Sequence, residues 1–218
     1  MPRARNPQVA GRLLDAAARI IAEEGRQALT ARRLARQIGA STMAVYTNFG
    51  SMDELLLQLL RDGFVRFGDA LDEPAVTADP VADWIVQGWA YRRFALDNRN
   101  LYRVMFGDGF GAPQFADPAD QAVAAATFTS LLDRLRRAAD AGRLVVDDVE
   151  LAGQVVWSMV HGHMTLELAG YFEAPGRDAE VVYAECMRRL ALAYGDESDA
   201  LDASLRAARR RARRAVSR

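Results

Sequence analysis

The sequence predicts an all-α protein in which a short N-terminal helix-turn-helix region precedes a larger helical region. Apolar residues recur three to four positions apart through most of the chain, which is the period of an amphipathic helix. Short alternating runs of Val, Ile, Thr and Tyr, which are typical of strands, are nearly absent. Asn or Asp precedes Pro at three places, where the first side chain can cap a helix and Pro fits its first position. These pairs are Asn6-Pro7, Asp79-Pro80 and Asp117-Pro118.

Glycines and caps delimit the helices of the N-terminal part. A helix is expected over about 7–24, ending at Gly25, and two short helices are expected over 30–38 and 41–48, separated by Gly39. A fourth helix is expected over 51–71, because Ser51 and Glu54 have the spacing of a capping box. The apolar stripe of the first helix consists of Val9, Leu13, Ala17, Ile20 and Ile21.

The remaining helices follow the same logic. Asp147 and Glu150 form a second candidate capping box, and Gly- and Pro-containing segments after residue 106 and around Pro175 interrupt the helical pattern. Helices are expected at about 80–97, 99–106, 118–141, 148–172 and 178–194. The predicted organisation is a helix-turn-helix domain over 1–50, a connecting helix over 51–72, a helical domain over 73–195 and an Arg-rich tail over 196–218.

Charge is distributed unevenly along the 218 residues, although the net charge is only −1. Residues 1–50 carry a net +5, residues 201–218 carry +6, and residues 51–200 carry −12. Basic ends on an acidic body suggest a polyanionic partner at the ends. Cys186 is the single cysteine, which excludes an intramolecular disulfide framework and a Cys-based zinc site.

The clearest motif is TARRLARQIGASTMAVYTNF at 30–49, which has the spacing of a helix-turn-helix. Leu34 and Ile38 lie four apart on its first helix, and Val45 and Phe49 lie four apart on its second, so both pairs can pack on the preceding helix. The other side chains of the second helix are small or hydrogen-bonding groups that suit the major groove of DNA. These outward residues are Ser41, Thr42, Met43, Ala44, Thr47 and Asn48. The hydroxyls of Thr30 and Ser41, at helix N-termini, favour phosphate oxygens.

Residues 8–60 resemble the DNA-binding domain of the TetR family of bacterial transcriptional regulators. The resemblance rests on the paired alanines of the first helix, Glu24-Gly25, Leu29-Thr30, Leu34-Ala35, Gly39-Ala40-Ser41, Tyr46, Asn48-Phe49 and Glu54-Leu55. It implies that Tyr46 contacts a phosphate and that Thr42, Met43 and Ala44 face base edges. It also implies that Thr47 and Asn48 contact the DNA backbone or the bases.

One position departs from the family pattern, because Met52 stands where many members have a phosphate-binding Lys. We therefore expect Arg32, Arg33 or the N-terminal arm to make the contacts with the DNA phosphates. Arg3 and Arg5 of that arm are open to two interpretations, a minor-groove contact or a solvated chain start.

Two segments of the second half, NRNLYRVMFG at 98–107 and VVWSMVHGHMTLELAGYF at 155–172, resemble the WHG-type regulatory domain of a branch of this family. The resemblance implies a helical domain that dimerises and holds a pocket for a small-molecule inducer. Aromatic and Met residues at helical spacing are usually core, but their number here suits a large apolar pocket for a neutral or cationic hydrophobic ligand. Candidate ligand-binding residues are Trp84, Phe94, Tyr102, Met105, Phe106, Phe128, Trp157, His161 and Met164.

The last two predicted helices before the tail carry long apolar faces. Internal burial would explain them, but the family resemblance favours a two-fold four-helix interface between protomers. The candidate interface residues are Leu151, Val155, Met159, Val182, Cys186 and Leu190.

The function expected from these observations is a homodimeric repressor that binds a near-palindromic operator in double-stranded DNA and is released by a small hydrophobic molecule. A regulator without an inducer, an activator, and a nonspecific DNA binder driven by the tail are the alternatives. We expect no enzymatic activity and no cofactor, because no nucleophile-base pair or phosphate loop is evident. His161 and His163 are two apart on a helix and face different directions, so no metal site is expected.

The start of the chain lacks the apolar run of a secretory signal, and no stretch is apolar enough to span a membrane, so a cytoplasmic protein is expected. The tail segment RAARRRARR at 206–214 has three interpretations that the sequence does not separate. It is a solvated charge run, a nonspecific contact to DNA, or an intramolecular contact with the acidic body.

Overall fold

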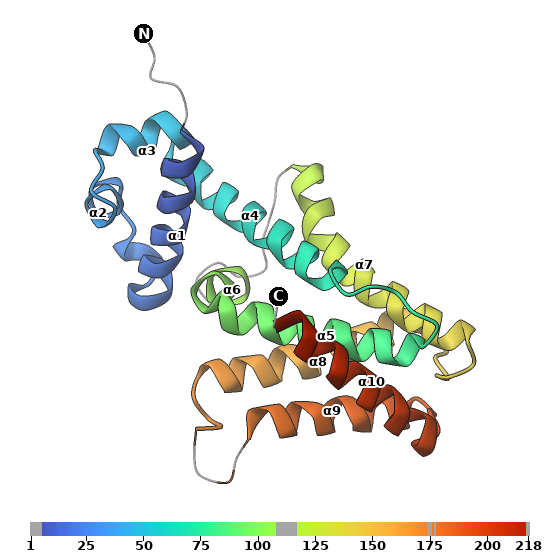
Figure 1. The fold of residues 1–218 in the computed structure, drawn as a ribbon. Coiled ribbons are helices and arrows are strands. Elements are labelled where there is room, and N and C mark those ends of the chain that lie inside the picture. The colour runs from blue at the N-terminus through green and yellow to red at the C-terminus, as the bar shows by residue number, and fades with distance from the viewer. Residues whose placement is uncertain (1–5, 108–116, 174–175, 177, 217–218) are drawn as a thin grey trace. The chain divides into compact units, whose positions relative to one another are not determined.

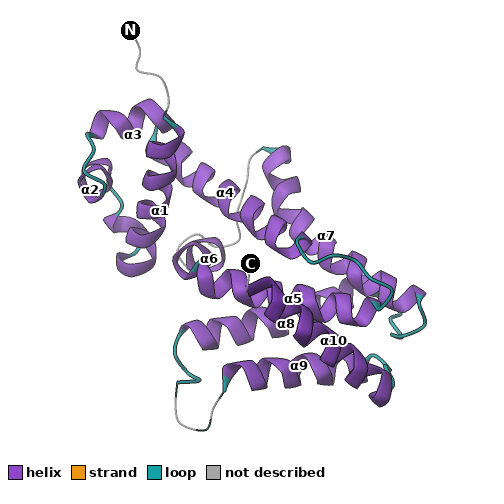
Figure 2. Cartoon of the chain, in the orientation of Figure 1, coloured by secondary structure: helices purple, strands orange, loops and turns teal. Residues whose placement is uncertain are grey.

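The computed structural model describes residues 6–107, 117–173, 176 and 178–216. In these residues the chain forms ten α-helices and one 3-10 turn and no strand (Figure 2), which confirms the predicted all-α class. The helices, labelled in Figure 1, are α1 (Pro7–Glu24), α2 (Ala31–Gln37), α3 (Thr42–Phe49), α4 (Met52–Asp72), α5 (Pro80–Asp97), α6 (Arg99–Phe106), α7 (Pro118–Asp140), α8 (Val149–Leu168), α9 (Ala179–Ala193) and α10 (Ser198–Val216), with the 3-10 turn at Arg26–Ala28.

The three predicted Asx-Pro pairs all begin helices. The side chain of Asn6 accepts hydrogen bonds from two backbone N–H groups in the first turn of α1, at 3.0 and 3.3 Å. Asp79 accepts one from the first turn of α5 at 3.0 Å, and Asp117 accepts one from the first turn of α7 at 2.8 Å. These N–H groups have no partner inside their helices, so the caps determine where the helices start.

Helix α8 differs from the prediction at both ends. Its cap is Asp148, whose side chain accepts the backbone N–H groups of Glu150 and Leu151 at 3.0 Å each, so the predicted box of Asp147 with Glu150 is wrong. The helix ends at Leu168, four residues before the predicted end. Gly170, which follows, has a φ of +82°, a conformation that favours glycine and does not continue a helix.

The chain divides into two compact units. The first contains residues 1–66 together with 98–124, and the second contains 67–97 together with 125–218. The border therefore falls inside α4 and inside α7. Helix α6 groups with the N-terminal helices, whereas the division predicted from the sequence places it in the 73–195 domain.

The first unit is built around α1, which contacts α2, α3 and α6. Leu13 and Ile20 of the predicted α1 stripe are buried, as are Leu34 of α2 and Val45 and Phe49 of α3. Each large apolar side chain that leaves water contributes about 1.5–3 kcal/mol. The structure thus confirms the prediction that both short helices pack on the first helix.

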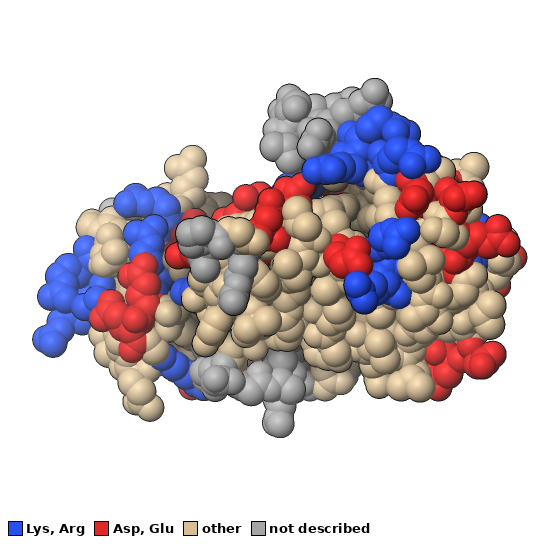
Figure 3. Space-filling view, turned by 90° about the horizontal axis from the view of Figure 1, so that it is seen from below, with Lys and Arg blue, Asp and Glu red and all other residues tan. Residues whose placement is uncertain are grey.

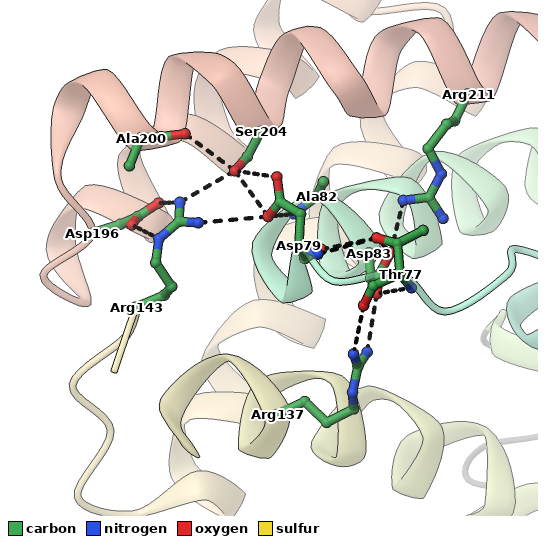
Figure 4. Close-up of polar contacts among 10 residues, drawn as sticks. All are labelled: Thr77, Asp79, Ala82, Asp83, Arg137, Arg143, Asp196, Ala200, Ser204 and Arg211. Atoms are coloured by element: carbon green, nitrogen blue, oxygen red, sulfur yellow. Dashed lines mark hydrogen bonds and ion pairs between the residues drawn. The ribbon is translucent and has the colours of Figure 1, made fainter. Parts of the chain in front are cut away.

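In the second unit, α5 contacts both α8 and α10 and is buried along most of its length. Its first turn carries Asp83, a fully buried carboxylate at the centre of a polar network (Figure 4). Arg211 of α10 donates to Asp83 Oδ1 at 2.7 Å, and Arg137 of α7 donates to Oδ2 at 3.0 Å. The backbone N–H and the hydroxyl of Thr77 each donate to Asp83 at 2.8 Å. Burial alone would raise the pKa of Asp83, but these hydrogen bonds outweigh it and hold the pKa below its ordinary value.

The arginines of this network also hold the segment that connects α4 to α5. Arg211 donates to the carbonyl oxygen of Ala75 at 2.5 Å, Arg137 to that of Thr77 at 3.0 Å, and Arg134 to that of Pro74 at 3.1 Å. The connecting segment has no regular secondary structure. Its conformation therefore depends on side chains from α7 and α10.

Replacing Arg211 by Met should lower the free energy of unfolding by about 3 kcal/mol, because Asp83 would remain buried with one cation fewer. Urea denaturation measures this loss. The double variant Asp83→Asn/Arg211→Met should cost less than the sum of its single variants, because both changes remove the same pair. Strictly additive losses would contradict the assignment of Arg211 as a partner of Asp83.

Candidate nucleic-acid interface

Helix α3 presents two opposite faces. Val45 and Phe49 are buried against the first unit's core, whereas Met43 is 69% exposed and Tyr46 is 47% exposed. Ser41 and Thr42 are also exposed, and Ala44 and Thr47 are half-buried. The exposed face carries a thioether, a phenol and hydroxyls, which can contact base edges and phosphates.

The turn between α2 and α3 has a conformation that its sequence explains. Gly39 has a φ of +69°, which costs little only for glycine. The backbone N–H of Ala40 donates to the carbonyl oxygen of Ala35 at 2.9 Å. The Arg12 guanidinium of α1 donates to the carbonyl oxygen of Ile38 at 2.8 Å, so the turn is held from the neighbouring helix.

The prediction that Asn48 faces outward is wrong, because its side chain is only 6% exposed. Its Oδ1 accepts the backbone N–H of Asn6 at 3.0 Å, and its Nδ2 donates to the carbonyl oxygen of Ala44 at 2.7 Å. Asn48 therefore ties the end of α3 to the residue that caps α1. This bond joins positions 42 apart in the sequence, and helical periodicity carries no signal for it.

The arginines predicted to grip phosphates fall into different environments. Arg32 is exposed on α2, but Arg33 is half-buried and paired with Glu24. Sequence reasoning missed Arg36, which is exposed four residues after Arg32 and so lies on the same face of α2. Within the described residues, neither Arg32 nor Arg36 forms an ion pair. Arg3 and Arg5 lie outside the described residues.

Two predicted phosphate-binding hydroxyls also act as helix caps. The Thr30 hydroxyl accepts the backbone N–H of Arg33 at 3.2 Å, and the Ser41 hydroxyl accepts that of Ala44 at 3.3 Å. Each hydroxyl keeps its own hydrogen to donate to an oxygen outside the protein. Met52 is half-buried at the start of α4. Arginine side chains gather on the surface of the N-terminal helices (Figure 3), as the local charge of +5 predicts.

Three of the nine candidate ligand-binding residues belong to the first unit and six to the second. Tyr102 and Met105 are buried in the first unit, and Phe106 packs there with its ring centroid 4.9 Å from that of Tyr102 and 5.7 Å from that of Phe64. In the second unit, three further candidates are buried core residues, namely Trp84, Phe94 and Met164.

The other three candidates lie together in the second unit. The ring centroids of Phe128 and Trp157 are 6.4 Å apart, and those of Trp157 and His161 are 5.8 Å apart. The hydroxyl of Tyr91, which the prediction missed, lies 3.5 Å from His161 Nδ1. Burial lowers the pKa of His161, so its ring is neutral at neutral pH. We call Tyr91, Phe128, Trp157 and His161 the aromatic cluster.

His163, the neighbour of this cluster in the sequence, points into another environment. Its Nε2 lies 3.3 Å from Oε2 of Glu167, which is four residues later on the same helix. The guanidinium of Arg92 on α5 donates two hydrogen bonds to the carboxylate of Glu167, at 2.9 and 2.5 Å. Burial lowers the pKa of His163 despite the nearby Glu167. Arg92 of α5 and Glu167 of α8 thus join the two helices through a pair of opposite charges.

Exposed apolar side chains lie on both α8 and α9, which pack against each other. Leu151 and Val155 of α8 are 57% and 43% exposed, and Val182 of α9 is also exposed. Met159, Cys186 and Leu190 are half-buried. Leu166 and Val181 extend the exposed surface beyond the six predicted residues.

Two other kinds of site are absent from the described part of the chain. These residues contain no group of three or more His, Cys, Asp or Glu arranged to hold a metal ion. Among the described helices, none combines the length and the apolarity that crossing a membrane requires.

Two family models match the chain. The model described as bacterial regulatory proteins of the tetR family matches residues 13–59. The model described as the tetracyclin repressor-like C-terminal domain matches residues 84–190. The first match includes α2, α3 and the turn between them, and the second includes the aromatic cluster.

Individual proteins agree with these matches. An HTH-type transcriptional regulator of Mycobacterium tuberculosis is 30% identical over 125 residues, which are 55% of this chain and 52% of that protein. The chain thus spans about half the length of the curated relatives it matches. The structure of the TetR family transcriptional regulator PfmR from Thermus thermophilus has 28% identity and a TM-score of 0.65, covering 85% of this chain and 100% of that one. A Rhodococcus protein of unknown function shares the fold, with 24% identity and a TM-score of 0.73 over 88% of this chain and 97% of its own.

Replacing Asn48 by Ala should lower the free energy of unfolding by about 2 kcal/mol, because the two hydrogen bonds of its buried side chain, to Asn6 and Ala44, would both be lost. Thermal or urea unfolding tests this expectation. The neighbouring variant Thr47→Ala is the control, since a half-exposed position should change stability by less than about 0.5 kcal/mol. An Asn48→Ala protein as stable as the parent would show that the Asn6–Asn48 bond does not matter.

Proposed function

The chain belongs to the TetR family of DNA-binding transcriptional regulators, and on this basis we propose that it is a homodimeric repressor released from its operator by a small hydrophobic molecule. The single observation that carries the DNA-reading part of the proposal is the two-faced helix α3. Its apolar face is buried in the first unit, while Thr42, Met43 and Tyr46 are exposed on the helix of a helix-turn-helix. Such a helix fits the major groove.

Two kinds of contact are expected at this surface. Thr42 and Met43, with half-buried Ala44, would read base edges through the hydroxyl and through apolar contact with thymine methyl groups. Tyr46, the hydroxyls of Thr30 and Ser41, and the exposed Arg32 and Arg36 would bind phosphates and so position the helix. Arg33 contributes less, because Glu24 already pairs with it.

The apolar surface on α8 and α9 supports a dimer. Leu151 and Val155 of α8 and Val182 of α9 are exposed on two helices that pack against each other, and exposed apolar side chains that gather in this way mark protein interfaces. Two copies related by a two-fold axis would cover this surface with a four-helix arrangement. A two-fold dimer places two copies of α3 on DNA symmetrically, so the operator should be a near-palindrome with half-sites about one helical turn or slightly more apart.

The aromatic cluster supports a ligand with a flat apolar body. Phe128 and Trp157 offer ring faces, while the Tyr91 hydroxyl and the neutral His161 ring offer hydrogen-bonding atoms nearby. A neutral aromatic compound with a polar group fits this chemistry better than a charged one. Helix α4 contains residues of both units and is the natural element for coupling, which typically amounts to about 1–3 kcal/mol between two sites.

A regulator without an inducer, or an activator, would use the same α3 surface. Release of the protein from its promoter DNA by an added aromatic compound separates a ligand-responsive regulator from one without an inducer. Reporter expression with and without the compound then separates repression from activation.

The reading surface is tested by selecting preferred sites from random duplexes with the full chain. Tyr46→Ala should weaken binding to every sequence by a similar factor, because phosphates are the same in all of them. Thr42→Ala and Met43→Ala should instead change the selected bases. Unchanged base preference in both of the latter variants would remove α3 from the reading surface.

The dimer is tested by Val155→Glu, which places a charge on the exposed apolar surface. We expect the parent protein to sediment as a dimer and the variant as a monomer, because the charge would have to be buried without a partner. Val65→Glu, at an exposed apolar position of the first unit, is the matched control and should stay dimeric. A monomeric parent would contradict the proposal directly.

A further inference from the structure

The C-terminal helix α10 has an inner and an outer face. Leu201, Ser204 and Ala208 are fully buried at three- and four-residue spacing, which defines the inner face. Arg211 continues this face and pairs with Asp83. An intramolecular contact with an acidic residue is therefore present at Arg211.

The outer face is formed by three arginines, Arg206, Arg209 and Arg210, all of which are exposed. They lie at three- and four-residue spacing, so their side chains share one side of the helix. Arg209 lies 3.7 Å from Glu180, a pair in which both side chains are largely exposed. Within the described residues, neither Arg206 nor Arg210 forms an ion pair. We call these three residues the basic face.

The basic face is carried by an anchored helix. The Ser204 hydroxyl lies within hydrogen-bonding distance of both oxygens of Asp79, at 3.0 and 2.8 Å, where α5 begins. Arg143 donates to buried Asp196, just before α10, at 2.8 and 2.9 Å (Figure 4). Because these contacts already order the helix, a partner would need to order only the three side chains.

Asp202, four residues before Arg206, is the acidic residue of α10 nearest to the basic face in the sequence. Asp199 and Asp202 lie in the first turns of the helix, and no acidic residue follows Asp202 in the sequence. Arg188 of α9 lies 3.3 Å from Asp202, so that charge is already engaged. Positive charge is thus concentrated on the outer side of the later turns.

We propose that the basic face is a second, sequence-independent DNA contact that binds phosphates of duplex DNA separately from α3. Positions 206 and 210 are about 6 Å apart along a helix axis. Duplex DNA carries one phosphate charge per about 1.7 Å of its axis, so a length of this size presents several charges to three guanidinium groups. Duplex DNA is the polyanion that a DNA-binding regulator meets most often, and guanidinium groups bind phosphate oxygens in pairs.

The test compares variants of the full chain for binding to a labelled duplex of random sequence over a series of salt concentrations. The variant Arg206→Gln/Arg209→Gln/Arg210→Gln removes the charges but keeps good helix formers. We expect the slope of log K against log salt to flatten by about 0.9 for each phosphate that the variant no longer binds. Arg206→Lys/Arg209→Lys/Arg210→Lys keeps the charges and should keep most of the slope.

Two further variants separate this contact from other effects. Arg211→Met breaks the inner face, so it should lower thermal stability and, where circular dichroism shows that α10 is retained, leave the slope unchanged. Tyr46→Ala alters α3, and combining it with the triple Gln change should add the two losses if the contacts are independent.

An unchanged slope in the triple Gln variant would overturn the inference, whatever α3 does. An equal loss in the triple Lys variant would also overturn it, because charge would then not be the cause. A flattening seen with single-stranded RNA but not with duplex DNA would assign the face to a different partner and so overturn the DNA contact. If operator selection failed while the triple Gln variant still lost nonspecific binding, the basic face would stand and the proposed repressor would not.

Discussion

An eight-residue helix is not stable in water on its own, and the reading helix α3 is one of that length. Everything proposed for DNA recognition depends on the contacts that keep it folded. Val45 and Phe49 are buried in the core built around α1, the Ser41 hydroxyl caps its first turn, and Asn48 joins its last turn to Asn6. One side of α3 is therefore packed against the rest of the first unit, and Thr42, Met43 and Tyr46 on the other side are exposed.

The helices were largely predictable because their boundaries are encoded locally. Asn6, Asp79 and Asp117 cap the helices that begin at the following Pro, and Gly25 ends α1, so neighbouring residues determine these ends. The burial of α1, α2 and α3 followed equally well from periodicity. The TetR family assignment rested on a pattern of many positions over residues 8–60, and the family match over 13–59 confirms it.

What the sequence did not show are contacts between distant positions. Asn48 was expected to face outward because it is polar, although it lies three residues after buried Val45; its partner, the backbone N–H of Asn6, is 42 positions earlier in the sequence. Arg33 and Glu24 are charged residues in a surface motif, and their pairing depends on the angle between α1 and α2. The roles of the tail arginines could not be separated either, because Arg211 differs from Arg210 only by the roughly 100° that one residue turns on a helix.

The Arg211–Asp83 pair also has a consequence for how the protein is made. The two residues are 128 positions apart, whereas the first unit draws only on residues up to 124. On the ribosome, the DNA-reading unit has all its residues available while the second half is still being synthesised. Asp83, by contrast, is synthesised early, and nearly all of the remaining chain must follow before Arg211 of α10 is available to pair with it. A chain that ended before α10 would contain every residue of the first unit but would leave the buried Asp83 carboxylate without the Arg211 guanidinium.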